Sequence, residues 1–362
     1  MRKYPCPAVQ DILGKATQQQ CLSSEEMIFL FNLTEEKETN RLFEVARSLR
    51  HKYFGNKIFL YGFVYFSTYC RNYCTFCGYR APNKLCLRYR KSEEEVVEVA
   101  KNLARSGVHL IDLTMGEDPY FYFRKNGFIS LINLVKHVKQ ETEMPVMISP
   151  GVVPKQVLTQ LAQIGIDWYA CYQETHNRGL FQRLRVNQDY NSRLRAKYIA
   201  KELGMLVEEG ILSGVGETEA DIATSMQVMK EIGAHQVRVM SFIPQAGSPM
   251  SHWSSPPRIR EMKIIAVLRL MFPDRLIPAS LDIDGVGGLK ERLNAGANVV
   301  TSLIPPNTGL AGIAQAQLDI DDGCRTVRGI MPLLEELELS AATLDDYIHW
   351  VREERDRLLR GG

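Results

Sequence analysis

The sequence has no long apolar run and no large excess of charge of one sign. Its hydrophobic stretches all fall short of the roughly 20 residues that a membrane-spanning helix needs. The N-terminal segment MRKYPCPAVQDILGK also lacks the uninterrupted apolar stretch of a secretory signal. The 44 basic and 42 acidic residues of the 362-residue chain give a net charge of only +2, which does not indicate a nucleic-acid or membrane-surface footprint. We therefore expect a cytoplasmic protein that binds small molecules and neither nucleic acid nor membranes.

Cysteine is too sparse for a secreted disulfide framework. Three of the eight cysteines, Cys70, Cys74 and Cys77, lie within one short segment, a placement that suggests metal binding in a reducing compartment. A [4Fe–4S] cluster usually takes four thiolates, so three in one loop leave one iron open to another ligand. A zinc site is the alternative, but it needs a fourth Cys or His nearby. The closest candidates fit poorly, because Cys86 follows a basic loop and His109 begins a predicted strand.

Short β-branched or aromatic runs alternate with amphipathic helical stretches from residue 57 onward, the pattern of parallel βα units. We expect eight strands, over residues 57–67, 109–114, 144–149, 167–173, 206–214, 236–242, 275–282 and 297–302. Eight such units in about 250 residues favour an α/β fold of the (βα)8 TIM-barrel type over an open doubly wound sheet. We assign residues 57–305 to this barrel. Residues 1–56 are expected to form an N-terminal helical layer that caps its bottom, and residues 306–362 a C-terminal helical extension with a solvated outer helix.

The C-x3-C-x2-C spacing, with the aromatic Phe76 before the last cysteine, resembles the signature of the radical S-adenosylmethionine (SAM) superfamily. The resemblance implies one [4Fe–4S] cluster whose open iron is chelated by the amine and carboxylate of SAM. The segment Thr114–Asp118 resembles the glycine-and-glutamate motif that receives the SAM ammonium, and the glycine-rich segment GILSGVGE would let adenine approach the backbone. The expected SAM contacts are Phe76, Gly116, Glu117, Ser149, Glu174, Arg193 and Gly214, with Arg185 and Arg195 as alternatives to Arg193.

Four polar side chains lie on predicted barrel strands where apolar residues are usual: Asp112, Arg238, Ser280 and Asp282. Buried charges are costly unless they serve a ligand or a partner. Ser280 and Asp282 are two residues apart and therefore point to the same face of their strand. An amino acid with a second amine would suit this set, with Arg238 and Ser280 binding the carboxylate and one Asp binding each ammonium. An internal salt-bridge network among the three charged residues is the alternative.

Longer segments, including DLTMGEDPY, YQETHN, GILSGVGE and RLMFPDRLIPASLDIDG, closely resemble the 3-methylornithine synthases, the lysine mutases that begin pyrrolysine biosynthesis. The resemblance runs from about residue 50 to residue 306. It implies that a 5′-deoxyadenosyl radical abstracts hydrogen from L-lysine, which then fragments and recombines to the branched 3-methylornithine. It also implies that Asp112, Arg238, Ser280 and Asp282 bind the substrate, and that a one-electron donor such as flavodoxin or ferredoxin reduces the cluster.

Three other radical SAM activities are alternatives to this interpretation. Lysine aminomutases need a Schiff-base lysine for pyridoxal phosphate, and after Lys230 only Lys263 and Lys290 remain, both on predicted helices. Biotin synthases need an auxiliary cluster, and Cys171 is the one spare cysteine on a predicted strand. Hydrogenase-cluster maturases share the barrel and the SAM motifs, and they stay the closest alternative. A cluster carrier without enzymatic activity would not need a buried polar pocket.

Overall fold

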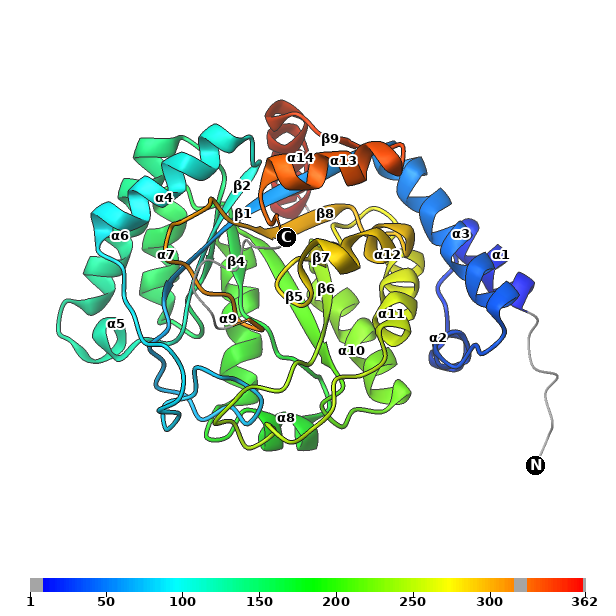
Figure 1. Ribbon diagram of the computed structural model, residues 1–362, viewed down its shortest axis with the longest axis horizontal. Helices are drawn as coiled ribbons and strands as arrows, with labels where there is room; N and C mark the ends of the chain where they lie inside the picture. The colour runs from blue at the N-terminus through cyan, green and yellow to red at the C-terminus, as the bar shows by residue number, and fades with distance from the viewer. Residues whose placement is uncertain (1–8, 316–323, 361–362) are drawn as a thin grey trace.

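The computed structural model describes residues 9–315 and 324–360, and its centre is a ring of parallel strands (Figure 1). In chain order the strands are β1 (Lys57–Ser67), β2 (Leu110–Met115), β3 (Val146–Ser149), β4 (Trp168–Ala170), β5 (Leu206–Ser213), β6 (Gln236–Ser241), β7 (Pro278–Ser280) and β8 (Val299–Leu303). They pair in the order β6-β5-β4-β3-β2-β1-β8-β7. A bridge between Gln236 and Leu276 joins the two ends of this order. The predicted eight-stranded barrel is therefore confirmed, and the open sheet is wrong.

Helices surround the barrel and connect its strands. They are α4 (Glu93–Ser106), α5 (Pro119–Phe123), α6 (Gly127–Thr142), α7 (Lys155–Gln163), α8 (Arg178–Leu184), α9 (Tyr190–Glu202), α10 (Glu219–Ile232), α11 (Arg258–Met271), the 3-10 helix η1 (Gly285–Gly288) and α12 (Leu289–Asn294). Local sequence explains their ends: Ser92 and Thr218 form capping boxes at the starts of α4 and α10. Gly107 and Gly233 end the same helices with φ of 94° and 63°, a conformation that favours glycine.

The N-terminal helices α1 (Val9–Thr17), α2 (Ser24–Phe31) and α3 (Glu36–Phe54) lie on the outer side of the barrel against α10 and α11 (Figure 1). The buried Arg50 of α3 donates from Nη1 to the carbonyl oxygen of Leu293 at 2.5 Å. The expectation that this layer caps the bottom of the barrel is therefore wrong. The apolar faces of these helices complement α10 and α11 instead of the ends of the strands.

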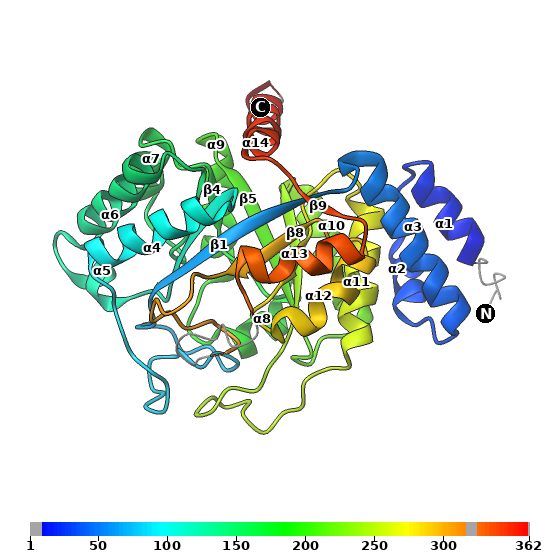
Figure 2. The same ribbon diagram turned by 45° about the horizontal axis from the view of Figure 1, so that its top comes forward.

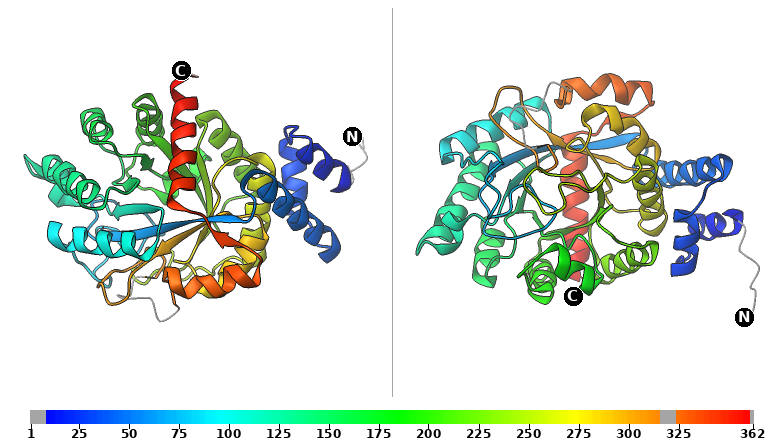
Figure 3. Two further views of the ribbon diagram at one scale, coloured as in Figure 1. Left: turned by 90° about the horizontal axis from the view of Figure 1, so that it is seen from above. Right: turned by 60° about the horizontal axis from the view of Figure 1, so that its bottom comes forward.

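The C-terminal extension contains α13 (Val327–Glu336), the short strand β9 (Ser340–Ala341) and α14 (Leu344–Arg360). The α14 helix covers the amino ends of the strands, and the right view of Figure 3 shows it behind the barrel when the loops face the reader. Tyr347 is fully buried and its hydroxyl lies 2.8 Å from that of Tyr61, while Trp350 stacks on Trp168. Most charged residues of α14 face solvent, as predicted for an outer helix, but the sequence reasoning missed the buried stripe of Tyr347, Val351 and Glu354.

The loops that follow the strands gather at the opposite, carboxyl end of the barrel (Figure 2). This is the end at which barrel enzymes place their reactive groups. Among the described residues, no helix has both the length and the apolar character to cross a bilayer.

Candidate active site

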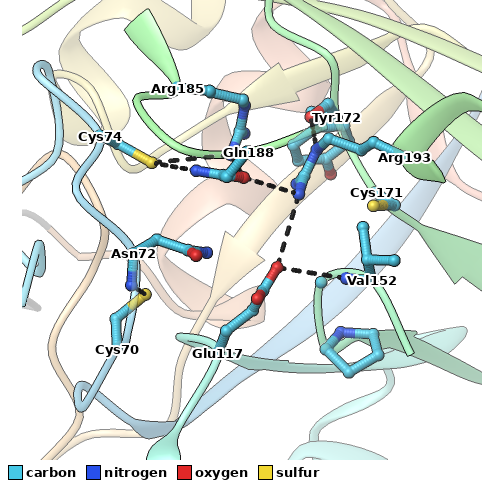
Figure 4. Close-up of polar contacts among 12 residues, drawn as sticks. Cys70, Asn72, Cys74, Glu117, Val152, Cys171, Tyr172, Arg185, Gln188 and Arg193 are labelled. Carbon is cyan, nitrogen blue, oxygen red and sulfur yellow. Dashed lines mark hydrogen bonds and ion pairs between the residues drawn. The ribbon is translucent and has the colours of Figure 1, made fainter. Parts of the chain in front are cut away.

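The three clustered cysteines lie in the loop after β1, and each sulfur accepts at least one hydrogen bond. Figure 4 shows the contacts of Cys70 and Cys74. Cys70 Sγ accepts from the amide N–H of Asn72 at 3.4 Å, and Cys77 Sγ accepts from that of Tyr79 at the same distance. Cys74 Sγ accepts from the side-chain amide of Gln188 at 3.0 Å. The three cysteines are free thiols. Hydrogen bonds to sulfur are typical of thiolates that hold an iron–sulfur cluster, where they tune its potential.

The three cysteines of this loop can all be ionised only if a positively charged ligand lies between them. Burial and the neighbouring Cys74 raise the pKa of Cys70 to about 11, and they raise that of Cys77 as well. Three thiolates would therefore repel one another unless a cation lies between them. In the described parts of the chain, no three His, Cys, Asp or Glu side chains are grouped as they would be around a single metal ion. Three thiols in one loop match the three protein ligands of a cluster with one open iron, whereas a structural zinc site takes four.

A cavity of about 140 Å³ borders these cysteines. All but one of the predicted SAM contacts line it: Phe76, Gly116, Glu117, Ser149, Glu174 and Arg193. The exception, Gly214, has a φ of 92°, and its amide N–H donates to Glu217 of the same turn at 2.8 Å. The structure therefore brings together predicted contacts from the loops after β1 and β2, from the end of β3 and from the segment after β4, whereas Gly214 shapes a turn and does not line this cavity.

Glu117 and Arg193 form the polar wall of the cavity (Figure 4). Arg193 donates from Nε to the carbonyl oxygen of Tyr172 at 2.6 Å, and its Nη1 lies 3.6 Å from Glu117 Oε1. The alternative residue Arg185 lines the same cavity but pairs with Glu174 at 2.5 Å. Arg193 and Glu117 therefore offer a positive and a negative group side by side, as the carboxylate and ammonium of an amino acid require.

Gly116 allows the loop after β2 to approach the cysteine loop. A Cβ atom at this position would lie 2.3 Å from the carbonyl oxygen of Tyr69 and 2.8 Å from Cys70 Cβ. Any side chain would therefore push the cysteine loop away.

A second polar group lies deeper in the barrel, around Arg238 on β6 and Asp112 on β2. Arg238 donates from Nε to Glu208 Oε1 at 2.6 Å, while its buried Nη2 has no hydrogen-bond partner. Asp112 Oδ1 accepts from the hydroxyls of Thr114 at 2.9 Å and Ser149 at 3.4 Å. Burial and the charge of Glu208 raise the pKa of Asp112 to about 7. The orphaned Nη2 of Arg238 is the feature that most clearly indicates an anionic ligand.

Glu208 was missed by the sequence reasoning. It lies on β5 within the segment LVEEGILSG, and it also accepts a hydrogen bond from the Tyr172 hydroxyl at 2.7 Å. The next residue, Glu209, points to the outer face and pairs with the buried Lys197 at 2.5 Å. Two adjacent acids on one buried strand must face opposite sides, so the pair was a signal that one carboxylate enters the barrel.

Asp282, just after β7, contacts the segment that follows β8. Its Oδ2 accepts from the amide N–H groups of Ile313 and Ala314, both at 2.8 Å, and its Oδ1 lies 3.6 Å from Arg325 Nη1. Asp282 Oδ1 is buried without a hydrogen bond. The hydroxyl of Ser280 lies 3.3 Å from the Asp282 amide nitrogen. No ion pair within the described residues joins Arg238 to Asp112 or Asp282, so the alternative of a closed internal network among these three is wrong.

Comparisons with known proteins agree with this architecture. The model of the radical SAM superfamily matches residues 64–229. A 3-methylornithine synthase of Methanosarcina acetivorans is 43% identical over 321 residues, which cover 89% of this chain and 91% of the relative. The crystal structure of a methylornithine synthase matches with a TM-score of 0.88 and 41% identity, covering 94% of this chain and 99% of that one.

A third relative has a different activity. The [FeFe] hydrogenase maturase subunit HydE of Thermotoga maritima is 32% identical over 262 residues, which cover 72% of this chain and 74% of the relative. The methylornithine synthase is more similar and covers more of both chains. The chain therefore belongs to the 3-methylornithine synthase family of radical SAM enzymes.

Proposed function

We propose that this enzyme isomerises L-lysine to 3-methylornithine, the first step of pyrrolysine biosynthesis. The observation that carries the proposal is the buried polar group around Arg238, whose Nη2 has no hydrogen-bond partner and which includes the buried carboxylates of Asp112 and Glu208. A substrate with one carboxylate and two amines supplies the complementary charges. Family membership supports the same reaction, since the matched synthases from Methanosarcina carry that name.

Cys70, Cys74 and Cys77 would hold the [4Fe–4S] cluster, and the open iron would take SAM. Glu117 and Arg193, which line the cavity beside these cysteines, would bind the ammonium and carboxylate of its methionine part, and Ser149 and Glu174 would complete the contacts. When bound, the cluster and SAM supply the radical that removes a hydrogen atom from the lysine side chain.

The charges of the inner pocket match those of lysine. Asp112, Glu208 and Asp282 carry three negative charges when all are ionised. Arg238 and Arg325, which lies 3.6 Å from Asp282 Oδ1, offset two of them, and the one net negative charge that is left matches the one net positive charge of lysine. Arg238 would bind the substrate carboxylate through Nη2, with help from the Ser280 hydroxyl. Asp112 and the Oδ1 of Asp282, which accepts no hydrogen bond, would each bind one ammonium.

Holding both charged ends keeps the two fragments of lysine together. A fragment that carried no anchored charge would diffuse away before recombination, whereas anchored fragments react at high effective concentration. All four proposed substrate-binding residues are buried, which excludes the water that would otherwise compete for their charges.

An isotope experiment tests the proposal. The reduced enzyme is incubated with SAM and carbon-labelled L-lysine, and the product skeleton is followed by mass spectrometry and NMR. We expect a branched isomer of equal mass, formed without stoichiometric accumulation of 5′-deoxyadenosine. Cys74→Ala should abolish SAM cleavage, whereas Cys86→Ala, which removes a cysteine outside the cavity, should leave it intact.

Stoichiometric 5′-deoxyadenosine with unchanged lysine would reject the mutase and favour a maturase-like activity. A biotin-synthase-like activity has little support. Besides the three cluster cysteines, Cys171 is the one cysteine of the described residues that lines the cavity, and a second cluster needs more ligands. We further propose a cytoplasmic enzyme that takes its electron from flavodoxin or ferredoxin, because free thiols suit a reducing compartment.

A further inference from the structure

The near-neutral charge of the chain is distributed unevenly around the cysteine loop. Residues 68–91, 119–126 and 175–188 contain several Arg and Lys residues but no Asp or Glu. We call the surface formed by these three segments the cluster face. Elsewhere acidic residues restore the balance, since the whole chain has a net charge of only +2.

The three segments are neighbours at the carboxyl end of the barrel (Figure 2). The Arg71 guanidinium lies 4.2 Å from the centre of the Tyr122 ring, which joins the first segment to the second. The amide N–H of Thr75 donates to the carbonyl oxygen of Leu184 at 2.8 Å, which joins the first to the third. The cluster face therefore surrounds the thiols of Cys70, Cys74 and Cys77.

Only part of this positive charge is neutralised within the protein. Arg71 and Arg90 pair with the buried Glu117 and Asp118 at 2.9 and 2.6 Å. Five other basic residues of the cluster face are exposed and form no ion pair with any described residue: Lys84, Arg124, Lys125, Arg178 and Arg183. The face therefore presents a net positive potential to solvent.

Large apolar side chains are exposed among these charges. Leu85 is 75% exposed, Phe123 is 68% exposed and Tyr73 is 44% exposed. Aromatic and aliphatic side chains beside arginine are typical of the centre of a protein–protein interface. A phosphate backbone offers no apolar surface for Leu85 to contact. The mixture of basic and apolar side chains therefore favours a protein over a nucleic acid as the binding partner of the cluster face.

We propose that the cluster face is the docking surface for a small acidic one-electron carrier protein. The inference rests on the proposed function, since a radical SAM cluster must be reduced by one electron before each SAM cleavage. The carrier loses one electron and the cluster gains it, and no bond forms or breaks in that step. The basic residues accelerate encounter with the acidic carrier, and the exposed side chains of Tyr73 and Leu85 provide apolar contact.

The test compares charge reversals on and off the cluster face. The first variant is Lys84→Glu/Lys125→Glu, and its matched control is Lys37→Glu/Arg352→Glu, which reverses two exposed charges on α3 and α14. Reduced acidic flavodoxin is mixed with each reconstituted enzyme without oxygen, and bleaching of the cluster absorbance gives the second-order rate constant. Affinity of oxidised flavodoxin for each enzyme is measured separately by calorimetry.

We expect the Lys84→Glu/Lys125→Glu variant to be reduced about tenfold or more slowly at low ionic strength, with weaker flavodoxin binding. The control should stay within about twofold of the wild type, and the difference should vanish near 1 M salt, where the Debye length is only about 3 Å. Photoreduced 5-deazaflavin, a small neutral reductant, should reduce all three enzymes equally.

Equal rates with flavodoxin for the two variants would overturn the proposal. So would a Lys84→Glu/Lys125→Glu variant that loses affinity for RNA or anionic vesicles but is reduced by flavodoxin at the wild-type rate. The lysine reaction is scored separately: if reduction depends on the cluster face but labelled lysine is unchanged, the docking surface stands and the mutase proposal fails. If 5-deazaflavin supports isomerisation of lysine but the rate of reduction by flavodoxin does not depend on Lys84 and Lys125, only the docking proposal fails.

Discussion

The substitution Asp112→Asn should weaken lysine binding and at the same time stabilise the empty protein. Asp112 is buried, and burial together with the charge of Glu208 raises its pKa from 3.8 to about 7. Asn keeps an oxygen that accepts hydrogen bonds from Thr114 and Ser149, as Asp112 Oδ1 does. The substitution removes the negative charge of Asp112. This charge would pair with an ammonium group of lysine, and without lysine it is buried at a cost in folding free energy.

The sign and size of the stability effect follow from the pKa. Between pH 3.8 and about 7 the unfolded chain ionises Asp112 while the folded chain keeps the proton, so this residue destabilises the fold increasingly as pH rises. The penalty is absent below pH 3.8 and complete above pH 7. The pKa shift of about 3 units lowers the free energy of unfolding by roughly 4 kcal/mol at most, a value reached above pH 7. At pH 5.5 the loss is about half of that.

Urea unfolding of the wild type and the variant at pH 5.5 and pH 8 measures this effect. Asp112→Asn should raise the free energy of unfolding at both values, and more at pH 8. Lysine at a hundredfold excess over its dissociation constant should stabilise the wild type by about 2.7 kcal/mol and the variant hardly at all. Asp346→Asn is the control with the opposite sign, because hydrogen bonds from Lys57 and Thr343 lower the pKa of that carboxyl to about 2. The assignment of Asp112 would be refuted if the wild type and Asp112→Asn had equal urea midpoints at pH 8, or if lysine stabilised both proteins equally.

Three further substitutions test other parts of the structure. Arg238→Lys should lose most lysine turnover while the cluster stays intact, because one ammonium cannot hold Glu208 and also present a forked contact to a carboxylate; normal turnover would make Arg238 structural. Gly116→Ala should prevent cluster incorporation, measured as iron content, since its Cβ would lie 2.3 Å from the Tyr69 carbonyl oxygen; a full iron complement would contradict this contact. Tyr347→Ala should lower the free energy of unfolding by about 3 kcal/mol, and a change below about 1 kcal/mol would show that α14 does not seal the barrel.

Much of the site could be predicted from the sequence because its parts are local. The cluster thiols come from one loop, so their spacing alone limits the metal chemistry. The strands of a barrel alternate with helices in a regular order, and the carboxyl ends of parallel strands meet at one end. Asp112 and Arg238 could therefore be placed in the barrel interior before any coordinates.

Only the tertiary structure decided how distant segments meet. Glu208 and Glu209 are equivalent in sequence, and strand alternation leaves open which of them faces the barrel interior until the sheet closes. The same holds for the termini: α3 and α14 are both amphipathic, but Tyr347 and Val351 fill the space below the strands, while the N-terminal helices match the outer surface of α10 and α11. Periodicity shows that a helix has an apolar face, and the shape of the complementary surface determines where that face is buried.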